Sequence, residues 1–212
     1  MKHILLLSTL LFVQVNFAQS QQNQLIVTVG ANQVPTFDKN KLGFNLSARY
    51  YLSDDLSVGG QFSIANKKYN RGFGYQVHNT LLNLYTINIP IQYDVVSNDK
   101  FTLGLGLSNG IMFAVLRNPD DVEEEEVYDS ETGISHIYYK PKRLNTDAYF
   151  VLTPNVDFTY KLLELDAEDN VSMLLNFNVG YQIPFGAGNF SKSSTFRNYT
   201  FNFGLSFKGL VD

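Results

Sequence analysis

Hydrophobic and polar residues alternate along most of this chain, and the alternation is clearest over Asn198–Lys208. The odd positions of this segment are large and apolar, whereas the even positions are small or polar (Tyr199, Phe201, Phe203, Leu205 and Phe207 against Thr200, Asn202, Gly204, Ser206 and Lys208). Successive side chains of a β-strand point to opposite faces. The segment is therefore predicted to be a strand with one apolar face and one polar face.

Seven earlier segments repeat this alternation, so eight strands are predicted, at Gln24–Ala31, Leu42–Leu52, Leu56–Asn66, Thr80–Val96, Lys100–Leu116, Asp147–Leu162, Val171–Phe185 and Asn198–Lys208. The connections after the second, fourth and sixth strands are short (Ser53–Asp55, Ser97–Asp99 and Glu164–Asn170), and the other connections are longer. Short turns on one rim and long loops on the other, with both termini at the short-turn rim, are typical of an outer-membrane barrel.

The polar face decides between a membrane barrel and a soluble barrel of the lipocalin kind, which also has eight alternating strands. A solvated surface is about 25–35% charged, but here the polar face is mostly Gly, Ser, Thr, Asn and Gln. Such small side chains fit the crowded lumen of an eight-stranded barrel. We therefore predict an all-β fold, an eight-stranded antiparallel up-and-down transmembrane β-barrel with short periplasmic turns, longer extracellular loops and an apolar face in lipid.

A cleaved signal peptide is predicted at residues 1–18, followed by an outer-membrane β-barrel domain at residues 19–212. The start of the chain is positively charged, Ile4–Val13 is apolar, and Ala18 offers a small residue at the cleavage point. A transmembrane anchor is the alternative, but the apolar run is too short for one and polar residues follow it.

The composition excludes several classes of protein. The chain has no cysteine, which excludes disulfides, thiolate metal sites and a lipoprotein anchor. Its net charge is −4, and eight of its twenty acidic residues lie within Asp120–Glu131. Nothing resembles a basic nucleic-acid footprint, so no nucleic-acid partner is expected. These observations favour the outer membrane of a Gram-negative bacterium, with outer-membrane lipid and lipopolysaccharide around the barrel.

One short segment carries a resemblance to a known group. The segment Tyr85–Tyr93, reading YTINIPIQY, resembles the strand signature of the small outer-membrane β-barrel proteins of Bacteroidota, the PorT-like group. The general design is also similar to the OmpX and OmpA barrel domains. The resemblance implies an accessory component of an envelope secretion or gliding apparatus, with an envelope protein partner.

The last strand also resembles an assembly signal. Asn202-x-Gly204-x-x-Phe207 is similar to the C-terminal signal read by the barrel-assembly machinery, which the resemblance implies as a partner during biogenesis. The chain departs from that signal because Gly209 stands where a hydrophobic residue is usual and Asp212 replaces a terminal aromatic.

Five charged residues are predicted to lie in the lumen towards the short-turn rim, namely Arg49, Asp94, Asp157, Lys161 and Lys208. Unpaired buried ions are costly, so we expect structural ion pairs that plug this half of the lumen. A gate or ion path is the alternative, which a filled eight-stranded lumen disfavours. Gly104, Gly106 and Gly110 superficially suggest a phosphate-binding loop, but they share one strand face, so they are interpreted as small interior residues that leave at most a small cavity.

The connection 117–146 is the most distinctive polar segment and is predicted to be an extended extracellular hairpin with an acidic arm and a basic arm. Its candidate contact residues are Asp120, Asp121, Glu123, Glu124, Glu125, Glu126, Tyr138 and Tyr139. A solvated surface loop, divalent-cation bridging to lipopolysaccharide and contact with a partner all remain open readings.

Enzymatic activity is not predicted. The mature chain has two histidines, His78 and His136, both in predicted extracellular loops. Ser135, His136 and Glu131 could supply the residue types of a lipid A- or phospholipid-modifying barrel enzyme, but nothing in their spacing fixes a geometry. We expect no cofactor, no metal site and no catalysis, and therefore a non-enzymatic outer-membrane protein with a structural or surface-binding role.

Overall fold

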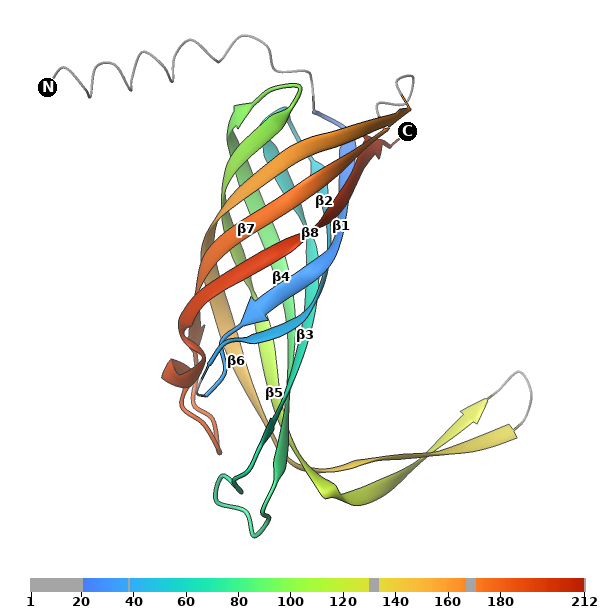
Figure 1. The fold of residues 1–212 in the computed structure, drawn as a ribbon, viewed down its shortest axis with the longest axis vertical. Coiled ribbons are helices and arrows are strands. Elements are labelled where there is room, and N and C mark those ends of the chain that lie inside the picture. Colours follow the sequence, from blue (N-terminus) through green and yellow to red (C-terminus); the bar gives the residue numbers. More distant parts are fainter. Residues whose placement is uncertain (1–20, 38, 130–133, 167–170, 212) are drawn as a thin grey trace, which may run out of the picture.

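Eight antiparallel strands form a closed barrel in the computed structural model, which describes residues 21–37, 39–129, 134–166 and 171–211 (Figure 1). The strands are β1 (Gln24–Val34), β2 (Lys41–Tyr51), β3 (Leu56–Tyr69), β4 (Thr80–Ser97), β5 (Phe101–Asp129), β6 (Ile134–Asp166), β7 (Val171–Phe185) and β8 (Asn198–Leu210), with one 3₁₀ turn, η1 (Ser193–Phe196), before β8. Each strand pairs with the next along the chain, and β8 pairs with β1. The predicted eight-stranded up-and-down fold is confirmed.

The two rims of the barrel differ, as the pattern of connections predicts. The turns β2–β3 and β4–β5 are short and lie on the rim where β1 begins and β8 ends, here called the short-turn rim (Figure 1). The longer connections β1–β2, β3–β4 and β7–β8 lie on the opposite rim, here called the long-loop rim. The predicted signal peptide and part of the predicted Glu164–Asn170 turn lie outside the described residues. None of the described helical segments is long and apolar enough to cross a membrane.

The apolar faces of the strands point outward and the small or polar faces point into the lumen. On β8, Phe203 is 55% exposed while Gly204 and Ser206 on the other face are buried. Interior glycines permit the strands to fit closely: a Cβ on Gly110 would lie 1.9 Å from the backbone oxygen of Ile87. The outer surface is therefore an apolar belt around a packed interior.

β5 and β6 extend far beyond the barrel wall, so the predicted ends of these two strands at Leu116 and Asp147 are wrong. The strands remain paired to Asp129 and Ile134, which forms the predicted hairpin as continuous sheet. The pairing register shifts twice at the root, between Leu116/Arg117 and Asn118/Val122. Bulges bend a strand, and the hairpin leaves the barrel axis and extends to the side (Figure 1).

Candidate functional site

An ion pair lies in the lumen nearer the short-turn rim. Arg49 on β2 and Asp157 on β6 meet with Nη2 and Oδ1 3.4 Å apart, and both side chains are almost fully buried. The Asp157 carboxylate also accepts hydrogen bonds from Thr159, Asn176 and Asn178. A buried carboxylate with a cationic partner and several donors is a satisfied structural charge.

The other three predicted interior charges, Asp94, Lys161 and Lys208, differ in the partners they contact. Asp94 accepts hydrogen bonds from the Tyr51 hydroxyl at 2.7 Å and from Gln92 Nε2 at 2.7 Å, and it has no cation in direct contact among the described residues. Lys161 pairs with Glu164 at the rim, with Nζ and Oε2 2.7 Å apart, instead of with an interior acid. Lys208 forms no ion pair within the described part of the chain. The five charges therefore do not form one network.

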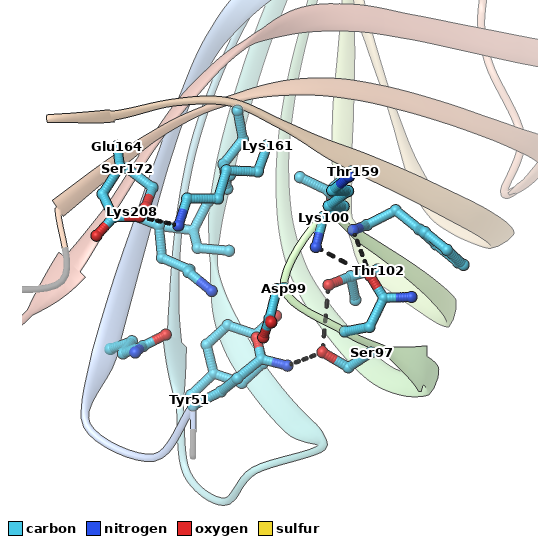
Figure 2. A pocket seen from close by; sticks show the side chains of 16 residues that line it. Tyr51, Ser97, Asp99, Lys100, Thr102, Thr159, Lys161, Glu164, Ser172 and Lys208 are labelled. Carbon is cyan, nitrogen blue, oxygen red and sulfur yellow. Dashed lines mark hydrogen bonds and ion pairs between the residues drawn. The ribbon is translucent and has the colours of Figure 1, made fainter. Parts of the chain in front are cut away.

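A small cavity lies beside these lysines at the short-turn rim. Figure 2 shows Lys208 and Lys161 reaching toward it from β8 and β6, with Tyr51, Ser97 and Thr102 on its other side. Its volume is about 70 Å³, and a water molecule takes about 30 Å³ in the liquid. The space is suited to a few waters and is too small for an organic substrate.

The middle of the lumen is filled by amide side chains that bond to one another. Gln61 donates to Asn45 Oδ1 at 2.8 Å, Asn178 donates to Asn155 Oδ1 at 2.9 Å, and Asn202 donates to Asn178 Oδ1 at 3.1 Å. Two cavities of about 40 Å³ each lie among these side chains. The predicted filling of the lumen by small polar residues fits this middle layer.

An apolar plug closes the lumen at the long-loop rim, and the sequence interpretation missed it. The plug consists of Val34, Ala65, Tyr69, Leu82, Leu84, Met112, Ala114, Tyr149, Val151 and Phe196, with Phe37, Phe73 and Phe190 packed against it. Phe37, Phe73 and Phe190 come from the long loops, and the Arg71 guanidinium lies 4.2 Å from the Phe73 ring centroid. The loops thus fold inward and cover the barrel mouth.

Asp147 fastens the β7–β8 loop to this plug. Its carboxylate is buried and accepts the backbone N–H groups of Asn189 at 2.7 Å and Phe190 at 3.2 Å. The Tyr149 hydroxyl donates to Ser191 O at 2.9 Å in the same place. These bonds hold the loop in position, so the cluster is interpreted as an anchor.

The hairpin has two unlike faces, because residues directly opposite in an antiparallel pair share a face. We call one the paired face: Asp121, Glu123, Glu125, Tyr138, Lys140 and Lys142. On it Lys142 pairs with Asp121 at 3.1 Å, and Lys140 pairs with Glu125 at 2.5 Å and with Glu123 at 3.9 Å. The hydrogen bond and charge of Lys140 lower the pKa of Glu125.

We call the other side the open face: Val122, Glu124, Glu126, Tyr128, Ile137 and Tyr139. Its apolar members are more than half exposed, with Tyr128 at 66% and Tyr139 at 65%. Within the described residues, neither Glu124 nor Glu126 has an ion pair or a hydrogen bond. Seven of the eight candidate contact residues are thus divided between the paired face and the acidic, aromatic open face. The eighth, Asp120, lies at the root of the hairpin, where it accepts a hydrogen bond from Asn79.

The structure gives no support to the catalytic set Ser135, His136 and Glu131. Ser135 is exposed on β6 near the hairpin tip, and Glu131 and the His136 side chain lie outside what the structure describes. His78 is exposed in the β3–β4 loop. No group of three or more His, Asp or Glu side chains suited to a metal ion occurs among the described residues.

Solved structures similar to this chain are small eight-stranded outer-membrane barrels. The attachment invasion locus protein Ail of Yersinia pestis, in complex with the heparin analogue sucrose octasulfate, is 16% identical with a TM-score of 0.50, over 88% of this chain and 99% of that one. Neisserial surface protein A is 13% identical (TM-score 0.51, 91% and 99%), and OprG of Pseudomonas aeruginosa is 12% identical (TM-score 0.52, 92% and 100%). No family profile and no curated protein sequence matches the chain. The likeness supports the barrel fold.

Proposed function

We propose that the chain is a non-enzymatic outer-membrane β-barrel protein whose hairpin, within residues 117–146, contacts a partner outside the cell. The observation that carries the membrane assignment is the apolar belt: strand-central residues such as Ile87, Leu105 and Phe203 are about half exposed. An apolar surface of this extent is not tolerated in water. A closed barrel spans lipid with every strand paired.

The orientation follows from the rims. In outer-membrane barrels the short turns face the periplasm and the long loops face outward. The hairpin and the apolar plug are then extracellular, and the start of β1 and the end of β8 face the periplasm. Residues 1–18 would direct export, the barrel-assembly machinery would insert the chain, and lipopolysaccharide would surround its outer half.

The lumen supports a structural role and not a conducting one. The apolar plug, the amide layer and the Arg49–Asp157 pair follow one another along it. A pore needs a continuous water-filled path, and cavities of about 40 Å³ do not supply one. Binding is therefore assigned to the outer surface, where the hairpin projects furthest.

Two measurements test the proposal. The folded protein should be found in the outer-membrane fraction and should change its gel mobility on heating, whereas recovery from the soluble periplasm would refute the membrane assignment. Replacing residues 119–142 by a short turn should leave the barrel folded and remove cross-links to partners in cells. Unchanged cross-links in that variant would refute the contact role of the hairpin.

A second candidate is an accessory role in an envelope secretion or gliding apparatus. The resemblance of Tyr85–Tyr93 to the PorT-like group supports it, together with the exposed aromatic residues of the hairpin. This candidate predicts co-purification with the same envelope proteins in every preparation. A chain that always isolates alone would count against it.

A further inference from the structure

The outer edge of β5 in the hairpin is an unpaired strand edge. The pairing of β4 with β5 ends at Leu81↔Arg117, and beyond that point β5 pairs with β6 alone within the described residues. An edge strand presents a row of backbone N–H and C=O groups that another strand can pair with. The segment Val122–Tyr128 is therefore accessible to strand addition from outside.

The charges beside this edge are unevenly satisfied. On the paired face, Glu123 and Glu125 already have Lys140 as their partner. On the open face, Glu124 and Glu126 have no cationic partner among the described residues, and they lie two positions apart on the strand, a spacing of about 7 Å. A strand placed beside β5 would put alternate side chains next to these two carboxylates.

The open face also has apolar area to bury. Ile137 is 57% exposed and Tyr139 is 65% exposed, and no third layer of described residues covers them. A two-stranded ribbon is only marginally stable in water by itself. An added strand would widen the sheet and bury part of this surface.

The charge pattern selects among possible occupants. A second copy adding edge to edge would place its own glutamates beside Glu124 and Glu126, and like charges opposite each other are destabilising. A polyanion, such as the heparin analogue bound to Ail, would meet the same repulsion. Lipopolysaccharide phosphates are also anionic and would need a divalent cation as a bridge.

We propose that the acidic edge of β5 accepts an extended basic segment of a partner protein as an added strand, with cationic side chains at alternate positions beside Glu124 and Glu126. This inference rests on the proposed contact function of the hairpin and names the partner's chemistry. Backbone pairing gives the strand addition, and the alternate cations give the specificity, as in other cases of β-augmentation.

The test uses the full chain in nanodiscs of zwitterionic lipid and a labelled nine-residue peptide in which Arg and Thr alternate. Binding is followed by fluorescence anisotropy, with the same peptide carrying Glu in place of Arg as the control. The variant E124Q/E126Q should weaken binding about tenfold, since two cross-strand charge pairs are lost. The matched variant E123Q/E125Q removes the same charge from the paired face and should change affinity by less than about twofold.

Backbone pairing is tested separately with a peptide N-methylated at alternate residues, which should bind at least about tenfold more weakly. Equal losses in the two double variants, or no effect of N-methylation, would overturn strand addition in favour of general charge attraction. Absence of binding to the unmodified protein, or binding only of lipopolysaccharide in the presence of Ca²⁺, would overturn the basic partner. If the peptide fails to bind but cross-links in cells still require the hairpin, the proposed contact function stands and only the basic partner strand is refuted. If the cross-links do not require the hairpin either, both the contact function and the basic partner strand are refuted.

Discussion

The buried pair of Arg49 and Asp157 gives a quantitative test of how the lumen is stabilised. Replacing Arg49 by Met removes the cation and leaves a carboxylate that is 4% exposed. Breaking a buried pair in this way costs about 3–5 kcal/mol. Three side-chain donors, from Thr159, Asn176 and Asn178, remain on the carboxylate, so we expect the lower end of this range, about 3 kcal/mol.

The substitution of the partner residue, Asp157→Asn, and the double variant complete a thermodynamic cycle. Asp157→Asn keeps a side-chain oxygen that can accept from the neighbouring donors. We therefore expect a loss of about 2 kcal/mol for this variant. The double variant R49M/D157N contains neither charge and should lose about 2–3 kcal/mol, which is less than the sum and gives a coupling of about 2–3 kcal/mol.

The assay is urea unfolding of the protein in lipid vesicles, followed by far-UV circular dichroism and by the fraction that keeps folded gel mobility. Lys161→Met is the control, because the Lys161–Glu164 pair is partly exposed and is worth about 0–1 kcal/mol. Additive losses in the double variant would refute the claim that Arg49 and Asp157 stabilise the lumen as a pair. A loss for Lys161→Met as large as that for Arg49→Met would refute the distinction between interior and rim.

Three further predictions concern the wall, the plug and the hairpin. Gly59→Ala should destabilise the barrel by about 1–3 kcal/mol in the same unfolding assay, because its Cβ would lie 1.9 Å from a backbone oxygen. Gly60→Ala is the control and should not destabilise the barrel, because the space around Gly60 is open. Phe196→Ala should cost about 3–5 kcal/mol and speed proteolysis of the β7–β8 loop. Because Lys140 lowers the pKa of Glu125, their pair is intact above the ordinary glutamate pKa and is lost as pH falls through the lowered value. A carboxyl NMR titration should show the pKa of Glu125 return toward its ordinary value in Lys140→Gln, and an unchanged titration would contradict the pairing.

Strand number and the direction of the faces were predictable because a period of two is a local signal. The small size and low charge of the polar face, which includes Gly204 beside the outward Phe203, then assigned that face to the lumen. The ends of β5 and β6 were less predictable, because these two strands stay paired with each other beyond the barrel wall. Val122–Glu126 contains four consecutive glutamates, which are not favoured in strands, yet it pairs with the returning arm through ion pairs and backbone bonds.

The apolar plug was missed because the sequence interpretation expected mostly small and polar side chains in the lumen. Leu82, Leu84 and Met112 occupy inward positions, where they are buried against residues of the long loops. Their clustering at the long-loop ends of β4 and β5 is the signal that would have found the plug. Ion-pair partners were harder to predict. The alternation of inward and outward positions shows which charges face the lumen, but which of them meet depends on the stagger between strands. Arg49 and Asp157 lie on strands that are not neighbours in the barrel.

In the hairpin, the residues that hold the two arms together are not those of the proposed contact surface. Its root is tied to the β3–β4 loop, where Asn145 donates to the Tyr75 hydroxyl at 2.6 Å and Asn79 donates to Asp120 at 3.1 Å. The ion pairs that join its two arms all lie on the paired face. The open face is therefore not needed to hold the arms together, because its glutamates and aromatic rings make none of these bonds. A substitution there should change binding without changing the fold, which is why the two double variants of β5 can isolate the contact from the scaffold.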